Sequence, residues 1–433
     1  MARQYPGLFA RAVRMVSAVE ANEIKATVVS TLFVFVLMAS YYILRPVRDA
    51  MASDWTDTEV SLLWNINFFV SAAIVAVYGF AVSRARLRNV VPAMYGFFAL
   101  SFVAFYFGVS AVADRELVDK TFYLWVSVFA LFHVSVFWTF MADTFSKGQA
   151  KRLFAIIGAG ASAGAIVGPS IPALFAQKLG TDQLMLIASV GLTLVIPLVF
   201  YLYHLKGTEL GNRGLDADTS QVRIGGRWWE GFRAFATNPF LLGIGAFILL
   251  YVFIGSFVYF EQKNLLTEFS RAERTQILGS IDWVVNVLTF GLAFFVTGRI
   301  VTNIGMPLAL ALMPVLICAG LLILAFAPVL TVLLALQVFR RGGNYGLTRP
   351  AREMLFTSVS AEDRFKAKPV IDIVVYRGGD AVSGTLFAIL TDRLGLGLAA
   401  VAAIGAGIAA LWGWVGVRLG RIFDRNQTEV SSG

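Results

Sequence analysis

Long stretches without a single charged residue constrain this chain more than any other feature of its sequence. They cover residues 26–44, 60–83, 89–113, 121–142, 153–177, 183–205, 234–260, 283–298, 300–339 and 394–417. A membrane-spanning helix needs about 20 consecutive, mostly apolar residues, and most of these stretches reach that length. Charged residues make up only 15% of the chain, against about 25% in soluble proteins. The sequence therefore excludes a soluble enzyme and predicts a protein that crosses a membrane many times.

These ten stretches and one further segment yield twelve predicted spans. The stretch 300–339 is long enough for two, and Ala327 and Pro328 predict the turn between them, because proline lacks a backbone donor. Residues 369–391 form a further span that contains three charged residues, Asp372, Arg377 and Asp380. In lipid a single hydrophobic segment satisfies its own backbone only as a helix. We therefore expect an all-α polytopic membrane protein with twelve transmembrane helices in two six-helix halves.

The distribution of basic residues predicts the orientation of the chain. With these spans, 24 lysines and arginines fall on one side of the membrane and nine on the other, and the side rich in basic residues faces the cytoplasm. We expect both termini in the cytoplasm and the protein in a bacterial inner membrane. The predicted segments are a cytoplasmic N-terminal segment 1–25, a first half 26–205, a central cytoplasmic loop 206–236, a second half 237–418 and a cytoplasmic tail 419–433.

The net charge of +9 does not require a nucleic acid partner. Basic cytoplasmic segments are attracted to anionic lipid headgroups, so membrane lipids and a small solute are the expected partners. The sequence contains no cluster of metal ligands, no nucleophile triad and no phosphate-binding loop. We therefore expect neither an enzyme nor a bound cofactor or metal.

The central loop divides the chain into six spans and six. Displacing the sequence by 216 residues places Arg152 on Lys368 and Gly168 on Gly384, which is a weak sign of internal duplication. Two such halves resemble the architecture of major facilitator transporters. In that architecture the halves are related by an axis along the membrane normal, and the substrate site lies between them.

Several predicted spans contain polar or ionisable residues that the bilayer disfavours. An ionised side chain at the membrane centre costs about 2.5–3.5 kcal/mol on insertion scales. Each ionisable residue in a span therefore requires a structural or functional explanation. At the end of the first span, Arg45, Arg48 and Asp49 share one helical face by their spacing. Pro46 is expected to break the helix there. The other candidates lie in spans 2, 8, 10 and 11, and are Asn65, Asp282, Arg340, Arg341, Asp372, Arg377 and Asp380.

Two interpretations of these residues stand side by side. In the functional one, arginines in a polar cavity bind an anionic solute, since guanidinium matches phosphate and carboxylate groups. The carboxylates then serve coupling ions such as protons, and the candidates are Asp49, Asp282, Asp372 and Asp380. In the structural one, Arg45 with Asp49 and Arg377 with Asp380 are ion pairs, or the arginines reach the membrane surface from span ends.

Three glycines in the fifth span, Gly160, Gly164 and Gly168, recur every four residues. A glycine-rich run can hold a phosphate group, but such a loop follows a strand, and the surrounding run here is hydrophobic. This spacing instead predicts a smooth helix face on which a second helix packs closely.

Four motifs resemble the nucleotide (ATP/ADP) transporters of plastids and intracellular bacteria. Residues 44–49, LRPVRD, resemble that family's span 1 motif LRDTKD, with Arg48 in place of a lysine that faces substrate. The second motif includes residues 150–155, AKRLFA, with the pairs Leu124–Trp125 and Phe137–Trp138 before it. The third and fourth are Pro350 with residues 352–354, and residues 366–372, KAKPVID, in which Lys368 falls on a nucleotide-binding lysine of the family. The resemblance covers residues 40–385 and implies a transporter that exchanges nucleoside tri- and diphosphates, an ATP:ADP antiporter.

Two departures bear on the substrate. Tyr123 stands where the family has an acidic residue before the Leu-Trp pair, and arginine is not equivalent to lysine at a phosphate site. The leading expectation is a secondary transporter that binds an anionic metabolite through Arg45, Arg48, Lys368 and Arg377 and works by exchange or with protons. The alternatives are a proton-coupled transporter of another organic anion, and a membrane sensor or assembly scaffold that transports nothing.

Overall fold

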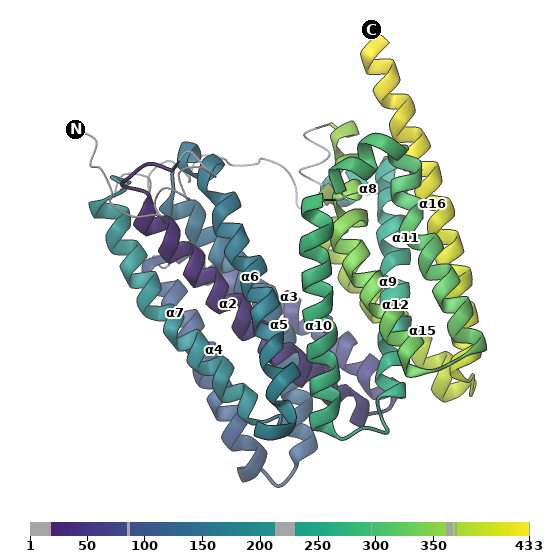
Figure 1. Cartoon of the computed structure of the whole chain (residues 1–433), viewed down its shortest axis with the longest axis horizontal. Coiled ribbons are helices and arrows are strands. Elements are labelled where there is room, and N and C mark those ends of the chain that lie inside the picture. Colours follow the sequence, from purple (N-terminus) through teal and green to yellow (C-terminus); the bar gives the residue numbers. More distant parts are fainter. Residues whose placement is uncertain are drawn as a thin grey trace. The chain divides into compact units, whose positions relative to one another are not determined.

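The chain folds almost entirely into helices (Figure 1). The computed structural model describes residues 19–84, 87–212, 230–295, 297–360, 367–368 and 370–432. The predicted segment 1–25 and the predicted loop 206–236 lie largely outside the described residues, and their boundaries stay predictions. The helices of the first half are α2 (Ile24–Met51), α3 (Asp57–Arg84), α4 (Leu87–Ala111), α5 (Arg115–Thr144), α6 (Lys147–Leu179) and α7 (Gln183–Thr208).

The helices of the second half follow a short amphipathic helix, α8 (Glu230–Thr237). Two spans of the second half are interrupted by π-helical turns, and a short 3-10 turn, Phe356–Ser358, follows α13. A 3-10 turn in the first half, Ala52–Asp54, connects α2 to α3. The elements are α9 (Pro239–Leu265), α10 (Arg271–Phe295), α11 (Thr297–Phe326), α12 (Leu330–Gly343), π-turn η4 (Asn344–Thr348), α13 (Arg349–Leu355), π-turn η6 (Val370–Val375), α15 (Tyr376–Ala388), π-turn η7 (Ile389–Arg393) and α16 (Leu398–Ser432).

The predicted fold class, with twelve spans in two six-helix halves, is confirmed. Eight of the described helices are long and apolar enough to cross a membrane by length and composition alone. The other four spans are α3 and α10, which begin with charged first turns, and α12 and α15, which π-helical turns interrupt. The predicted turn in the longest apolar stretch is also present, because α11 ends at Phe326 and α12 begins at Leu330.

One expectation about the first span is wrong. Pro46 does not break the helix, because α2 continues through it to Met51. A proline inside a membrane helix is tolerated where neighbouring helices and local adjustments satisfy the freed backbone groups. Arg45, Arg48 and Asp49 therefore stay on one continuous helix.

The chain forms two compact units, and each takes one helix segment from the other half of the sequence. The first unit holds α2, α3 from Val70 onward, α4 to α7, and α10 up to Trp283. The second holds the start of α3 up to Phe69, α9, α10 from Val284 onward, and α11 to α16. The beginnings of spans 2 and 8 are thus exchanged between the units, which mirrors the two-fold pattern of the sequence.

In the first unit, α2 lies between α6 and α7 (Figure 1). The predicted glycine face explains how closely α2 and α6 approach. A Cβ atom built on Gly160 would lie 2.5 Å from the backbone oxygen of Thr31, and one on Gly168 would lie 2.6 Å from that of Ala39. Gly164 faces the backbone oxygen of Phe35 in the same way. The prediction of a packing face, rather than a phosphate site, is confirmed.

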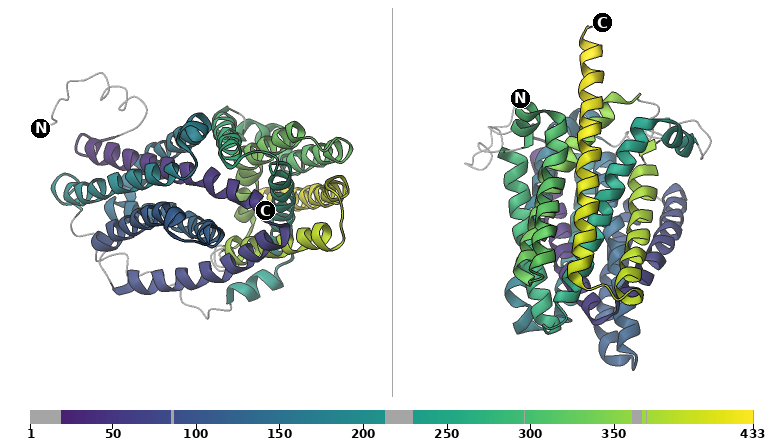
Figure 2. Two further views of the ribbon diagram at one scale, coloured as in Figure 1. Left: turned by 90° about the horizontal axis from the view of Figure 1, so that it is seen from below. Right: turned by 90° about the vertical axis from the view of Figure 1, so that its right-hand side faces the viewer.

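In the second unit, α16 runs along α11, and α9 packs against α15 and α16 (Figure 2). The apolar core includes Phe247 on α9 and Trp412 on α16, whose rings lie 5.4 Å apart. Phe257 and Phe260 of α9 contact the ring of Phe387 on α15. Helix α9 thus packs against α12, α15 and α16 in this unit.

The glycine face offers a test of the fold. Gly164→Ala places a methyl group against backbone atoms of α2, and overpacking of this kind costs about 1–3 kcal/mol. We expect the variant to unfold at a lower temperature in detergent. Gly158→Ala is the matched control, because a Cβ there has nothing within 4 Å, and it should leave the melting temperature unchanged or raise it slightly. Equal melting temperatures for the two variants would contradict the close approach of α2 and α6.

Candidate functional site

The last turns of α2 place two arginines beside one carboxylate. Arg48 donates to Asp49 Oδ1 from Nε at 2.9 Å and from Nη2 at 2.6 Å. Arg45 Nε lies 3.7 Å from Asp49 Oδ2. These side chains are 11–21% exposed, so their charges are only partly screened by solvent. The predicted shared face of Arg45, Arg48 and Asp49 is present.

Helix α10 adds a second carboxylate to this group. Asp282, which is 3% exposed, lies with its Oδ1 3.6 Å from Arg45 Nη1. We call Arg45, Arg48, Asp49 and Asp282 the first charge cluster. It joins residues more than 230 positions apart, because the start of α10 packs in the first unit. With two cations and two anions, the cluster is close to neutral.

Helix α5 lines the first charge cluster with polar and aromatic groups. Ser127 Oγ accepts a hydrogen bond from Arg48 Nη1 at 3.3 Å. The Arg48 guanidinium carbon lies 5.5 Å from the centre of the Tyr123 ring, a cation–π contact. The aromatic residue at 123, which departs from the nucleotide-transporter pattern, therefore contacts the arginine that replaces that family's lysine.

The second unit contains a group of buried arginines with a different balance of charge. Arg340 and Arg341 end α12, and Arg352 lies on α13; each is less than 9% exposed. All three lie within electrostatic range of the buried Tyr251 phenol on α9. We call Arg340, Arg341 and Arg352 the second charge cluster. Arg352 pairs with a carboxylate, that of Glu353, at 3.0 Å.

Arg340 is held by an amide instead of a carboxylate. Its Nε and Nη2 donate to Gln337 Oε1 at 3.0 and 2.7 Å, and its guanidinium carbon lies 5.9 Å from the centre of the Tyr251 ring. Gln337 in turn donates to Gln262 Oε1 of α9 at 2.7 Å. Among the described residues no carboxylate lies within 4 Å of Arg340. This buried cation is therefore positioned but not neutralised.

Two glycines and a π-helical turn directly follow Arg340 and Arg341. After Gly342 and Gly343, helix α12 passes into α13 through the π-turn η4. Side chains of Leu288 and Met313 occupy the space where Cβ atoms of these glycines would lie. Single π-helical turns within helices are frequent at functional sites.

The predicted residues on span 11 are brought together only in part. Arg377 Nη1 lies 3.7 Å from Asp380 Oδ2, and both side chains are about 30% exposed. The Tyr376 ring lies 6.4 Å from that of Tyr251, which connects this helix to the surroundings of Arg340. Asp372 falls among the residues whose side chains the structure does not describe, so its predicted role stays a prediction.

Lys368 shares the carboxylate of Glu353 with Arg352 of the second charge cluster, whereas the hydrogen bonds of Asn65 go to residues outside both clusters. Lys368 Nζ pairs with Glu353 Oε2 and lies 5.1 Å from the centre of the Phe356 ring. Glu353 lies beyond the predicted span. Burial raises the pKa of its carboxyl group, but the hydrogen bonds from Lys368 and Arg352 have the larger combined effect, so that this pKa is lowered. Asn65 donates to Thr385 Oγ1 on α15 at 3.1 Å.

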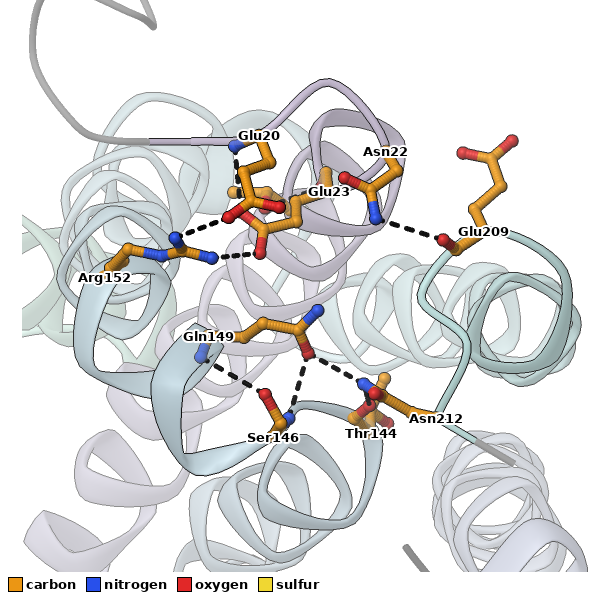
Figure 3. A network of polar contacts seen from close by, with 10 residues as sticks. Glu20, Asn22, Glu23, Thr144, Ser146, Gln149, Arg152, Glu209 and Asn212 are labelled. Atoms are coloured by element: carbon orange, nitrogen blue, oxygen red, sulfur yellow. Dashed lines mark hydrogen bonds and ion pairs between the residues drawn. The ribbon is translucent and has the colours of Figure 1, made fainter. Parts of the chain in front are cut away.

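A polar network ties the start of α2 to α6 and α7 (Figure 3). Arg152 donates to Glu20 Oε1 and Glu23 Oε1 at 2.7 and 2.5 Å. Asn212 donates to the Thr144 carbonyl oxygen and to the Gln149 side chain. Arg152, which belongs to one of the nucleotide-transporter motifs, thus has a structural role here.

Sequence reasoning missed several buried charges near span ends. Lys206, predicted in the central loop, is buried in α7 and pairs with Asp143 at 2.9 Å. Lys263 pairs with Asp57 at 2.8 Å in the second unit, and Arg271 pairs with Asp119 at 2.7 Å in the first. Lys206 directly follows a charge-free stretch and Lys263 lies three residues beyond one, so a search limited to such stretches left both outside the membrane.

The Lys263–Asp57 pair fixes the exchanged start of α3 to the end of α9 and can be tested by substitution. Lys263→Met leaves a buried carboxylate without its cation, and breaking a buried pair costs about 3–5 kcal/mol. We expect a marked drop in melting temperature in detergent. Lys25→Met is the control, since Lys25 is 58% exposed in its pair with Glu209 and such pairs contribute about 0–1 kcal/mol. A Lys263→Met protein as stable as wild type would contradict this role.

A known protein family matches most of this chain. A family model described as Major Facilitator Superfamily matches residues 31–366. No curated protein matches the chain by sequence.

Several solved structures share the fold at low sequence identity. A bacterial homologue of the human lysosomal transporter Spinster is 15% identical, with a TM-score of 0.60 over 94% of this chain and 99% of that one. The nucleoside transporter NupG is 12% identical, with a TM-score of 0.65 over 92% and 99%. The xylose transporter XylE from E. coli is 13% identical, with a TM-score of 0.57 over 90% and 95%. Identities this low establish the fold and no substrate.

Proposed function

The chain belongs to the major facilitator superfamily, and from this premise we propose that it is a secondary transporter of an anionic metabolite. It is an integral membrane protein, and its family and structural relatives point to a transporter rather than an enzyme. In this architecture the halves rock against each other and expose a central site to either side of the membrane. The chemistry of the solute is argued from the charges of this chain.

The observation that carries the proposal is Arg340. A buried cation in a helical bundle is costly unless it is paired, and Gln337 offers only a neutral acceptor. An anion with phosphate or carboxylate oxygens would complete the coordination of this guanidinium in a bidentate way. The adjacent Arg341 adds positive charge on the same helix end. The second charge cluster therefore favours an anionic solute over a neutral one.

Nucleotide exchange is the more specific form of this proposal. The Tyr251 ring, 5.9 Å from the Arg340 guanidinium carbon, and the Tyr376 ring next to it provide aromatic surfaces beside a cation. A molecule that combines a phosphate chain with an aromatic base presents matching groups, since bases stack on aromatic side chains. The motif resemblance to nucleotide transporters supports the same substrate class, and with it an NTP/NDP or ATP:ADP antiport mechanism.

The first charge cluster has a different role in this proposal. Arg45 and Arg48 are already neutralised by Asp49 and Asp282, which favours the structural interpretation of these residues in the described geometry. They become anion ligands when the carboxylates release them, for example on protonation. Coupling through Asp49, Asp282, Asp372 or Asp380 belongs to the alternative, a proton-coupled transporter of another organic anion.

A sensor or scaffold without transport is less well supported. Such a protein has no need for a buried arginine without a carboxylate, because that arginine costs stability. We further propose a bacterial inner-membrane location with both termini in the cytoplasm, partners limited to lipids, a small anion and protons or counter-substrate, and no nucleic acid partner. Arg48, Lys368, Arg377 and Asn65 stay candidate solute contacts beside Arg340 and Arg341.

A ligand screen tests the anion proposal. ATP, ADP, sugar phosphates and dicarboxylates should raise the melting temperature of the detergent-purified protein if they bind its folded state. A ligand at 100 times its dissociation constant adds about 2.7 kcal/mol. We expect at least one anion to do so, and Arg340→Gln to remove the effect.

The control is Arg421→Gln, which removes an exposed arginine of α16 and should keep the ligand response. Nucleotide binding that survives Arg340→Gln would contradict the assigned residue. A wild-type protein stabilised by neutral nucleosides or sugars, and by no anion, would contradict the proposed substrate class.

A further inference from the structure

The end of α9 carries four consecutive polar residues, Glu261, Gln262, Lys263 and Asn264. Three of them have partners in the second unit. Gln262 accepts from Gln337, Lys263 pairs with Asp57, and Asn264 donates to Asp57 Oδ2 at 3.1 Å. Glu261, unlike these neighbours, has no hydrogen-bond partner among the described residues.

Glu261 is completely buried, at 0% exposed. Neither of its carboxylate oxygens has a hydrogen-bond partner, and no described cation forms an ion pair with it. By helical spacing it continues the face of Ile254, Phe257 and Val258, which are all buried. Its surroundings are therefore the apolar core of the second unit.

The charged groups on the elements packed against α9 are engaged elsewhere. Asp57 pairs with Lys263, Arg340 bonds to Gln337, and Arg377 pairs with Asp380. The other titratable side chains described on these elements are Asp54 after α2, Glu59 on α3, Arg233 on α8, Arg341 on α12, Tyr376 on α15, and Arg418, Arg421, Asp424 and Arg425 on α16. None of them forms a hydrogen bond with either carboxylate oxygen of Glu261. No described group stabilises a negative charge at this position.

We infer that Glu261 is a proton-binding site of this protein. An ionised carboxylate without donors in an apolar interior is strongly disfavoured, so the side chain holds its proton while it is buried. When water reaches the carboxyl group, the O–H bond breaks, the proton passes to water, and a carboxylate remains. Glu261 is outside the set of carboxylates that the sequence suggested.

The position of Glu261 gives a route by which solvent access changes. The turn Ala52–Asp54 and the start of α3 pack on the end of α9, where Asn264, three residues from Glu261 and on the same helix face, donates to Asp57 Oδ2 at 3.1 Å. These residues belong to the exchanged segment that precedes the rest of α3. If this segment leaves α9 during transport, water reaches the residues beneath it. The proton would then be the coupling ion of the transporter, a step that rests on the proposed anion transport and gives it a proton-coupled mechanism in place of strict exchange.

Infrared spectroscopy tests proton binding without any substrate. In the detergent-purified protein at pH 7, we expect the carbonyl stretch of a protonated carboxyl group, which shifts in D₂O and when glutamate is labelled with ¹³C at its carboxyl carbon. Glu261→Gln should abolish this band. Glu209→Gln is the control, since Glu209 pairs with Lys25 near the surface, and it should keep the band.

Two spectroscopic outcomes would overturn the inference. One is the absence of a glutamate-derived band at pH 7, and the other is a band that persists in Glu261→Gln. The labelled wild-type protein decides the first outcome even if the variant does not fold.

Transport then tests coupling separately. In proteoliposomes acidic outside by one pH unit, with the membrane potential held at zero by potassium and valinomycin, one coupled proton drives about tenfold accumulation of ADP, and Glu261→Gln should equilibrate ADP without accumulating it. Equal accumulation by both proteins would exclude Glu261 from coupling. If the wild-type protein carries no labelled ADP even into proteoliposomes loaded with unlabelled ADP, nucleotide transport fails as a proposal, while the infrared result still decides proton binding.

Discussion

An ionisable group buried in this helical bundle is costly unless it is neutralised, because neither lipid nor an apolar core solvates a charge. The pairs that meet this requirement also hold the architecture. Asp57 with Lys263 and Asp119 with Arg271 fix the first turns of α3 and α10 in units to which the rest of each helix does not belong. That placement brings Asp282 to Arg45. The same electrostatic requirement therefore shapes both the helix ends and the candidate site.

The fold was predictable because its main signal is local. Charge-free stretches mark most helices, and Pro328 marks the turn between α11 and α12. Charge-free stretches do not mark the helix ends correctly where a charge is neutralised by a partner distant in sequence. Lys206 looks like a loop residue in sequence, yet Asp143 allows it to be buried in α7. Pro46 was misjudged for a related reason, since the effect of a proline on a membrane helix depends on its neighbours.

The candidate site was predictable to a smaller extent. Helical spacing alone places Arg45, Arg48 and Asp49 on one face, and the structure agrees. Spacing says nothing of Asp282, which comes from another helix and makes the cluster neutral, or of Gln337, which holds Arg340 without neutralising it. Whether an arginine binds solute or a neighbouring carboxylate is decided by tertiary contacts. The sequence could nominate these residues but not separate the two roles.

The two units differ in how their buried charges are balanced, and this difference bears on mechanism. In the first, Arg45 and Arg48 face Asp49 and Asp282, so the group is close to neutral without any ligand. In the second, Arg340 has no carboxylate within 4 Å among the described residues, and Glu261 has no donor. An anion would satisfy Arg340, and a proton satisfies Glu261. Helix α9, which carries Glu261, and helix α12, which carries Arg340, are connected by the Gln262–Gln337 hydrogen bond. A conformational change at one of these two residues can therefore alter the contacts of the other. A solute and a proton bound in one unit would then be released by the same movement of helices.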